Sequence, residues 1–376
     1  MNLRSLLVSS DEATVRILRR VLSDLEIAVE HSSAPEPAIR QLTRHRFEAI
    51  IVDASNPDEA RDVMRSAKAA PSNSRALTIV LVEAALGLKG GFEMGAHFVL
   101  HKPLTRERAR SSFRAVRALM KRERRRQVRV AVQIPVDCSA IGSATRYSAK
   151  TLDICEGGMA IEFAGRVAKE SALRFTLNLP NVEPNLDLVG ELAWDGGGRH
   201  AGVRFTQITE QQRAALRRWL NSQLPEPEQD DPPVRCQLTD LTLGGCYLET
   251  LSPFPAGTRV NLSLRSADLN VRAAGIVRVM HPEYGMGVEF WQNTPEQRDQ
   301  VHEIIEALRS KGETSAELLV EPEGLEAGST TEDNSAEGFV AASDDLLVEL
   351  FRHHAQVPVE IFLQQMRQQR QAAAGK

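Results

Sequence analysis

Cysteine, aromatic residues and long apolar runs are all scarce in this chain of 376 residues. The cysteines lack the paired spacing of a metal site, so we expect reduced thiols; they are Cys138, Cys155, Cys236 and Cys246. No apolar run approaches the ~20 residues of a membrane span, and the N-terminus becomes charged too early for a secretory signal. We therefore expect a cytoplasmic protein without a membrane span.

Patterns that carry catalysis are missing as well. No Ser/His/Asp set, Gly-rich phosphate loop or paired acid and base stands out, so we do not expect an enzyme. The net charge of -4 gives no overall signal for nucleic acid or a membrane surface. The length and the hydrophobic content of 42% do allow two or three domains with buried cores.

Residues 1–122 alternate between strand and helix patterns. Residues 47–53, 76–82 and 95–104 are typical of buried strands, whereas residues 11–25 have apolar residues at helical spacing after a candidate N-cap, Asp11. Such alternation predicts a doubly wound α/β domain with a parallel sheet. Sites in these sheets form at the carboxyl ends of strands, which is where Asp53 and Lys102 fall.

This segment resembles the receiver domain of bacterial response regulators, a flavodoxin-like fold, on the strength of Asp53, the sequence HKPL and the strand spacing. The resemblance implies that Asp53, with Lys102, would accept a phosphoryl group beside an acidic pair that holds Mg²⁺. Here the acidic positions read Ser9 and Ser10, and hydroxyls are poor Mg²⁺ ligands. We therefore expect neither Mg²⁺ binding nor efficient phosphorylation, but a fold kept for packing or homodimer contacts.

A basic segment follows this domain. Eleven Lys or Arg and two Glu lie between Arg106 and Arg129. A solvated helix face is the usual explanation for such a run, and a patch for DNA or acidic lipid is the alternative. No helix-turn-helix pattern follows and no aromatic residue separates the arginines between Lys121 and Arg129, so DNA binding is not expected.

An internal repeat occupies the middle of the chain. Asp153, Cys155, Gly157 and Gly158 recur as Asp240, Thr242, Gly244 and Gly245 at an offset of 87, and GVRF at 202–205 recurs as GVEF at 287–290. Alternating strand patterns lie between the motifs, and each copy closes with an amphipathic helix after a candidate N-cap, Thr209 or Thr294. The repeat predicts two small β domains, each with a C-terminal helix.

The first copy, residues 123–224, resembles the PilZ domain, a six-stranded β-barrel that binds cyclic di-GMP. Two motifs in order carry the resemblance: Arg-x-x-x-Arg before the first strand, and Asp-x-Cys-x-x-Gly where the family has Ser for Cys. It implies a cyclic di-GMP site made of these residues: Arg125, Arg126, Arg129, Asp153, Cys155, Gly157 and Gly158.

The residue types suit that ligand. A guanidinium donates two hydrogen bonds to guanine O6 and N7, clamps phosphate oxygens, or stacks on a purine. The Asp153 carboxylate can accept from guanine N1–H and N2–H₂. A hairpin turn between barrel strands is the alternative role for Asp153 and the glycines. Cys155 is a weaker donor than Ser, which predicts an affinity loss of about tenfold at most.

The second copy, residues 233–311, follows an acidic, Pro-rich linker at 225–232. Only Arg235 stands near its Asp240, and the stretch ahead of Asp240 is too short for a full first strand. We expect a degenerate PilZ-type barrel whose Asp240, Thr242 and Gly245 hold a turn rather than a ligand.

Residues 312–376 form a tail. Between 312 and 351 there are eleven Asp or Glu and no Lys or Arg, which predicts disorder through about Ala342. Two short amphipathic helices, separated at Pro358, are expected beyond it. Their apolar stripe would dock on the chain's own domains or on a partner protein; it comprises Leu346, Leu347, Leu350, Phe351, Ile361 and Phe362.

The leading hypothesis is a bacterial signalling effector that binds cyclic di-GMP in its first PilZ-type barrel and signals through protein contacts. The ligand would draw the arginines of the connector toward Asp153. Two alternatives stay open: a scaffold without a small-molecule ligand, and a regulator phosphorylated at Asp53. The protein partner and the downstream process are not encoded in any motif.

Overall fold

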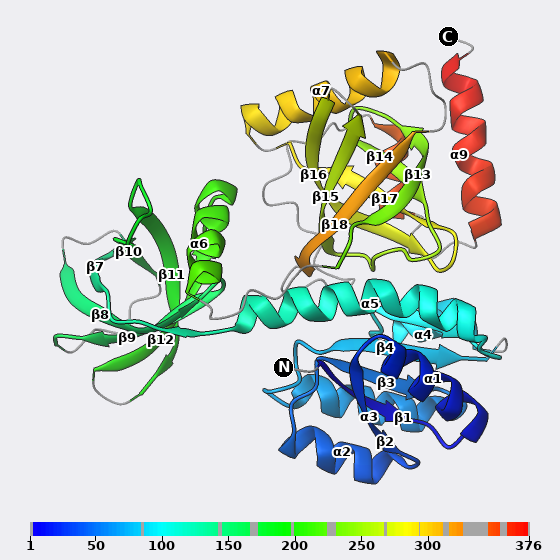
Figure 1. The fold of residues 1–376 in the computed structure, drawn as a ribbon, viewed down its shortest axis with the longest axis horizontal. Coiled ribbons are helices and arrows are strands. Elements are labelled where there is room, and N and C mark those ends of the chain that lie inside the picture. The colour runs from blue at the N-terminus through cyan, green and yellow to red at the C-terminus, as the bar shows by residue number, and fades with distance from the viewer. Residues whose placement is uncertain are drawn as a thin grey trace. The chain divides into compact units, whose positions relative to one another are not determined.

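The computed structural model describes residues 3–83, 86–141, 145–165, 172–196, 199–223, 231–266, 269–292, 294–310, 316–325, 345–353 and 359–374. The chain divides into two compact units (Figure 1). The first joins Met1–Glu123 with Asp231–Lys376, and the second is Arg124–Asp230. The linker predicted at 225–232 lies outside the described residues up to residue 230.

The N-terminal domain is a receiver-like α/β fold. Its five-stranded sheet has the order β2-β1-β3-β4-β5 and every pairing is parallel, as the strand–helix alternation predicts. The strands are β1 (Leu3–Val8), β2 (Ile27–Ser32), β3 (Ala49–Asp53), β4 (Leu77–Val82) and β5 (Phe98–His101). Strand β4 is buried along its whole length, because helices cover both faces of a parallel sheet.

Two helices of this domain begin at side-chain caps. Asp11 Oδ1 accepts a hydrogen bond from the Ala13 amide and starts α1, which confirms the predicted cap. Asn56 does the same for α3. The helices are α1 (Glu12–Asp24), α2 (Pro35–Arg44), α3 (Pro57–Ala69), α4 (Gly87–Glu93) and α5 (Arg106–Gln127). None of the helices in the described ranges is long and apolar enough to cross a bilayer.

The basic segment is α5 and the two residues after it, and much of its charge is used inside the first unit. Arg117 Nη1 and Lys121 Nζ lie 2.6 and 2.8 Å from Asp231 Oδ1. Arg122 Nε donates to the Glu323 carbonyl at 2.8 Å. These contacts favour a structural role for this part of the run over a nucleic-acid patch.

The first β-barrel lies in the second unit. Strands β7 to β12 close a six-stranded ring in the order β8-β7-β10-β11-β12-β9, which the β8–β9 pairing completes. This confirms the predicted strand number. A short strand, β6 (Val130–Ala131), adds to β8 outside the ring. The ring strands are β7 (Pro135–Ala140), β8 (Arg146–Cys155), β9 (Gly158–Phe163), β10 (Leu173–Leu177), β11 (Leu186–Asp195) and β12 (His200–Gln207).

Helix α6 (Glu210–Ser222) follows the first barrel and packs on its core. Thr209 caps it reciprocally with Gln212, as the sequence predicts for Thr209. Its apolar face buries Leu216, Trp219 and Leu220 in the same cluster as the barrel interior. The helix thereby covers apolar residues that the six strands leave open.

The second barrel contains the same six strand positions in a permuted chain order. Its strands are β13 (Val234–Leu241), β14 (Gly245–Glu249), β15 (Thr258–Ser266), β16 (Leu269–His281), β17 (Gly285–Phe290) and β18 (Glu317–Leu325). In the first barrel β7 lies between β8 and β10; in the second, β18 lies between β13 and β15. The first copy begins with strand β7. In the second copy the strand at that position is β18, which comes after the closing helix α7 (Pro295–Ser310) in the chain. Helix α7 begins at a cap in which Thr294 and Gln297 each accept a hydrogen bond from the other's amide.

Strand β18 corrects two predictions. The second domain does not end at residue 311, and disorder from 312 to 342 is wrong for residues 317–325. Leu318 and Val320 are buried at 1% and 0% exposure, while Glu317 and Glu321 point outward. The acidic composition hid this alternation, because the carboxylates occupy the solvent-facing positions of the strand.

The two predicted tail helices are present as α8 (Leu346–His353) and α9 (Val359–Ala374). Leu347, Leu350, Phe351 and Phe362 of the predicted stripe are buried, whereas Leu346 and Ile361 are exposed. The helices pack on the second barrel, where Tyr247 and Val279 join their apolar cluster. Residues 326–344, predicted to be disordered, lie outside the described ranges.

Candidate functional site

The predicted arginines lie at the end of α5 and just beyond it. Arg125 and Arg126 are half-buried in the last turn of the helix. Arg129 follows two residues after the helix ends, and 48% of its side chain is exposed. The helix thus presents two guanidinium groups before the chain enters β6, and the third comes immediately ahead of that strand.

The structure brings Arg129 and Asp153 together. Arg129 Nη1 donates to Asp153 Oδ1 at 2.6 Å, and the Ala160 amide donates to the same oxygen at 3.3 Å. The strand register explains the contact, because β6 pairs Ala131 with Asp153, two residues after Arg129. The two sequence motifs therefore meet at one corner of the first barrel.

The glycines of the motif have different roles. A Cβ on Gly158 would lie 2.1 Å from the Val203 carbonyl oxygen on β12, so only glycine allows this close approach of β9 and β12. A Cβ on Gly157 would meet nothing within 4 Å, and Gly157 is exposed. Gly158 is thus needed to close the barrel, whereas Gly157 leaves an open backbone at the corner.

Cys155 is paired with Gly158 at the end of the hairpin and is 7% exposed. Its neighbour Glu156 is buried as well, and its Oε1 lies 3.4 Å from Arg217 Nε on α6. This ion pair fixes the hairpin against the closing helix. The sequence reasoning missed Glu156, because nothing in the strand pattern shows that a turn residue faces a helix.

A row of side-by-side residues extends from Asp153 across the outer face of the first barrel. Asp153 pairs with Ala160, Ala160 with Gly202, and Gly202 with Trp194. Directly paired residues project to the same side of a sheet. The neighbours Met159 and Ile161 belong to the interior cluster, so this row faces outward.

Trp194 was not singled out in the sequence, yet it is a prominent feature of this row. Its indole covers Gly202, where a Cβ would lie 2.0 Å from Nε1, and the residue is 48% exposed. Small residues therefore separate an exposed aromatic surface from the Arg129–Asp153 pair. The row thus has an exposed aromatic side chain at one end and charged hydrogen-bonding groups at the other.

The second barrel contains the corresponding row with different residues. Asp240 pairs with Tyr247, Tyr247 with Gly287, and Gly287 with Val279. Tyrosine thus replaces Ala160, and valine replaces Trp194. Thr242 closes the turn, since its amide donates to the Gly245 carbonyl at 2.9 Å. Arg235 is 78% exposed and pairs with Glu317 on β18.

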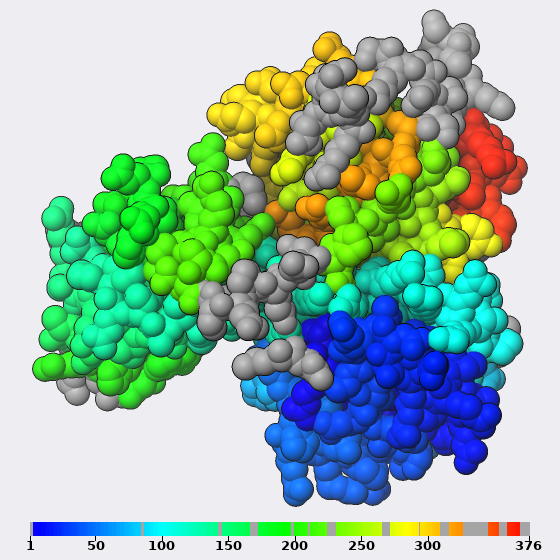
Figure 2. All heavy atoms as spheres, viewed as in Figure 1, coloured from blue at the N-terminus to red at the C-terminus, as the bar shows by residue number. Residues whose placement is uncertain are grey.

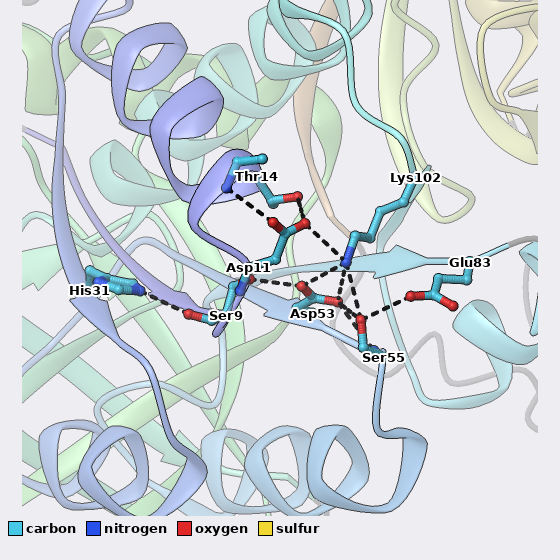
Figure 3. Close-up of polar contacts among 9 residues, drawn as sticks. Ser9, Asp11, Thr14, His31, Asp53, Ser55, Glu83 and Lys102 are labelled. Carbon is cyan, nitrogen blue, oxygen red and sulfur yellow. Dashed lines mark hydrogen bonds and ion pairs between the residues drawn. The ribbon is translucent and has the colours of Figure 1, made fainter.

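The receiver-like domain holds a separate polar cluster at the carboxyl ends of its strands (Figure 3). Lys102 Nζ lies 3.1 Å from Asp53 Oδ2 and 3.4 Å from Asp11 Oδ2. Ser9 Oγ donates to Asp53 Oδ2 at 2.7 Å, and Ser55 Oγ donates to Oδ1 at 2.9 Å. The predicted proximity of Asp53 and Lys102 is therefore present.

Hydrogen bonds and charge set the protonation of this cluster. The Thr14 hydroxyl, with the backbone and Lys102 contacts, holds the pKa of Asp11 below its ordinary value. Burial opposes the charge of Lys102, but the hydrogen bond and negative charge of Asp53 outweigh it and raise the lysine pKa. The Asp53 side chain is 5% exposed. Within the described ranges, no three carboxylates, histidines or cysteines gather as a metal site.

The comparison with family models identifies the two barrels. Residues 123–222 and 224–307 each match the model of the PilZ domain. The chain carries two PilZ domains. The second match stops before β18, consistent with a closing strand taken from an unusual place in the chain. PilZ domains are a family of cyclic di-GMP effectors.

The structural comparisons return receiver domains and a PilZ domain. CheY4 of Vibrio cholerae is 18% identical and has a TM-score of 0.29, over 31% of this chain and 99% of that one. The receiver domain of a sensor histidine kinase from Pseudomonas aeruginosa PAO1, solved with magnesium, is 22% identical with a TM-score of 0.29, over 32% and 99%. The PilZ domain of CeSA from a cellulose synthesizing bacterium is 18% identical with a TM-score of 0.22, over 25% and 95%. No curated protein matches the chain.

Proposed function

We propose that the first PilZ domain binds cyclic di-GMP and that the protein is a cytoplasmic bacterial effector. The observation that carries the proposal is the Arg129–Asp153 contact at 2.6 Å, which unites the cationic and acidic halves of the motif at one corner. Both groups are partly exposed, with 48% and 28% of their side chains accessible, so a ligand can reach them.

Ligand binding would exchange the partners of this corner. The Asp153 carboxylate accepts from guanine N1–H and N2–H₂ in place of Arg129, and the freed guanidinium turns to a phosphate or to guanine O6 and N7. The Ala160 amide keeps Asp153 oriented during the exchange. Asp153 exchanges a cation for two neutral N–H donors, and Arg129 exchanges a carboxylate for a phosphate or a guanine edge, so both groups keep hydrogen-bond partners.

The row of residues beside this corner suits a guanine base of the ligand. Ala160 projects only a methyl group, whereas the Trp194 indole fills the space over Gly202, so a flat base would lie against the indole and not on the Gly202 backbone. The exposed indole of Trp194 then provides a stacking surface, an interaction worth about 1–3 kcal/mol per base. Arg125 and Arg126, one turn earlier on α5, add positive charge for the two phosphates.

The output of the protein is a change in protein contacts and requires no catalytic step. Arginines on a connector become ordered on a polyanion, and such ordering changes the surface that a partner meets. The receiver-like domain acts here as an interaction domain. Asp53 is 5% exposed, and Lys102 lies between it and Asp11, where a receiver would place a divalent cation.

Titration calorimetry of the full chain with cyclic di-GMP tests the proposal. Arg129→Ala is expected to weaken binding about 10- to 100-fold, since hydrogen bonds to charged groups contribute ~1.5–3 kcal/mol. Arg129→Lys keeps the positive charge but loses the paired donors of the guanidinium group, so its affinity should lie between those of the wild type and Arg129→Ala. Arg235→Ala, which removes the arginine that stands near Asp240 in the second domain, leaves the affinity unchanged. Equal affinity for the wild type and Arg129→Ala would overturn the assignment.

A further inference from the structure

The second PilZ domain presents a covered version of the same outer row. Tyr247 and Val279 of this row are each 0% exposed, and they form a cluster with residues of α8 and α9. This cluster is distinct from the barrel interior, to which the neighbouring Cys246 and Leu248 belong. Figure 2 shows α9, in red, lying against the yellow-green surface of the second barrel.

Two phenylalanines fill the row. A Cβ on Gly287 would lie 2.6 Å from Phe351 Cε1, so the phenylalanine sits where even a methyl group would collide. The Phe362 ring lies 5.4 Å from the Tyr247 ring and 4.5 Å from the His281 ring, centroid to centroid. Phe351 and Phe362 are both 0% exposed. Gly287 and Tyr247 thus form the surface on which the two phenylalanines pack, which we call the aromatic seat.

Charged groups fix the orientation of the tail on this seat. Asp345 Oδ1 accepts from the Leu347 and Val348 amides at the start of α8, while its Oδ2 accepts from the Gly244 amide at 2.8 Å. At the other end of α8, Arg352 Nη2 donates to Glu289 Oε1 at 2.5 Å. The tail therefore supplies an anion to the Gly-Gly corner and a cation to a buried carboxylate of β17.

The two copies differ at the matched positions where the tail contacts the second copy. The three atoms nearest a Cβ on Gly244 all belong to Asp345 and Val348, whereas a Cβ on Gly157, its counterpart, meets nothing within 4 Å. Val279 and Phe351 share the space over Gly287, where their nearest atoms lie 2.7 and 2.6 Å from the position of a Cβ, whereas the Trp194 indole fills the corresponding space over Gly202. The second copy has thus lost its own aromatic cover and receives Phe351 instead.

We propose that the second PilZ domain is a receptor for an amphipathic helix, and that residues 345–366 of this chain are its ligand. The row that meets the nucleotide in the first domain binds a peptide in the second. Asp345 takes the place of the ligand's anion at the Gly-Gly corner, and Phe351 and Phe362 take the place of its bases. The comparison with the nucleotide rests on the proposed function of the first domain, whereas the binding of the tail to the second domain does not.

Binding of the tail in trans tests the proposal on the full-length chain. The probe is a fluorescently labelled peptide of residues 343–370, followed by anisotropy. Phe351→Asp in the full chain is expected to release the tail and open the seat, so the peptide binds this variant saturably. It binds the wild type at least about tenfold more weakly, because the tethered tail competes at an effective concentration on the order of millimolar.

Three controls keep the result decisive. Leu346→Asp alters an apolar residue that is 54% exposed on the same helix, so the seat stays occupied and peptide binding stays weak. Gly244→Ala narrows the seat itself, because its Cβ would meet Asp345 and Val348 of the bound segment, so adding it to Phe351→Asp weakens peptide binding about tenfold, whereas adding Gly157→Ala does not. A peptide carrying Phe351→Ala binds the opened seat at least about tenfold more weakly than the unaltered peptide.

The outcomes separate cleanly. Saturable binding to Phe351→Asp, with weaker binding to the wild type, to Leu346→Asp and to Phe351→Asp combined with Gly244→Ala, supports the receptor. Equal peptide binding to all four chains, or no binding to Phe351→Asp with its fold intact by circular dichroism, overturns it. Should Phe351→Asp fail to fold, Phe362→Asp, which alters the other buried phenylalanine of the tail, replaces it in the same comparison. Cyclic di-GMP titrations of the same variants report separately on the first domain.

Discussion

Leu318→Ala on β18 probes the permuted closure of the second barrel. Leu318 is 1% exposed and lies in the barrel interior, between the partners that β18 joins, β13 and β15. A buried Leu→Ala change costs ~2–5 kcal/mol through lost burial and the cavity left behind. Because a domain of this size is stable by only ~5–15 kcal/mol, the loss is a large share of its stability.

Trp291 provides a local probe for this experiment. It stacks under the Arg259 guanidinium of β15 at 4.5 Å, and it is one of three tryptophans in the chain. In a Trp194→Phe, Trp219→Phe background, its emission therefore follows unfolding of the second barrel. With a urea m-value of ~1–3 kcal/mol/M, the midpoint of this transition should fall by about 1 M or more.

Glu321→Ala is the matched control on the same strand. Its side chain is exposed, so the expected change is within about 0.5 kcal/mol. If Leu318→Ala moved the Trp291 transition no further than Glu321→Ala, β18 would not be part of the second barrel's folded core. The permuted strand order would then be refuted.

Three further predictions concern the corner, the buried histidine and the receiver-like cluster. Gly158→Ala should destabilise the first barrel by more than about 2 kcal/mol in urea unfolding, because its Cβ meets the Val203 carbonyl, while Gly157→Ala stays within about 0.5 kcal/mol; equal effects would contradict the distinction. Burial lowers the pKa of His281 to about 4, so below pH 6.5 the unfolded chain binds a proton that the folded chain does not, and the free energy of unfolding falls by up to roughly 3 kcal/mol between pH 6.5 and 4. His281→Gln should flatten this pH dependence of the Trp291 transition. An unchanged slope would count against the role of His281. Acetyl phosphate with Mg²⁺ should add no 80 Da mass (roughly one phosphoryl group) to Asp53 by mass spectrometry, since Lys102 already neutralises it; stoichiometric labelling would restore the phosphorylation hypothesis.

Local patterns in the sequence were sufficient for most of the fold. The parallel sheet, the caps at Asp11, Thr209 and Thr294, and the two tail helices all follow from periodicity and capping chemistry that act over a few residues. The sequence predicted that a ligand would draw the connector arginines toward Asp153, but it did not predict the direct ion pair of Arg129 with Asp153.

Features that depend on register or on distant segments could not be read in this way. Trp194 becomes part of the candidate site only because β11, β12, β9 and β8 align it with Asp153 across the sheet. Strand β18 has only two fully buried apolar side chains among glutamates, and its partners are more than 50 residues away. The amphipathic stripe of the tail was visible, but the surface it covers was not.

We propose that the nucleotide site lies in the first PilZ domain and that the second domain has lost it. Calorimetric titration of cyclic di-GMP into Asp153→Ala and Asp240→Ala full-length chains, side by side, measures this directly. We expect Asp153→Ala to weaken binding about tenfold or more, since it removes a charged hydrogen-bond acceptor, and Asp240→Ala to bind as the wild type does. Unchanged affinity in Asp153→Ala, or a matching loss in Asp240→Ala, would contradict it.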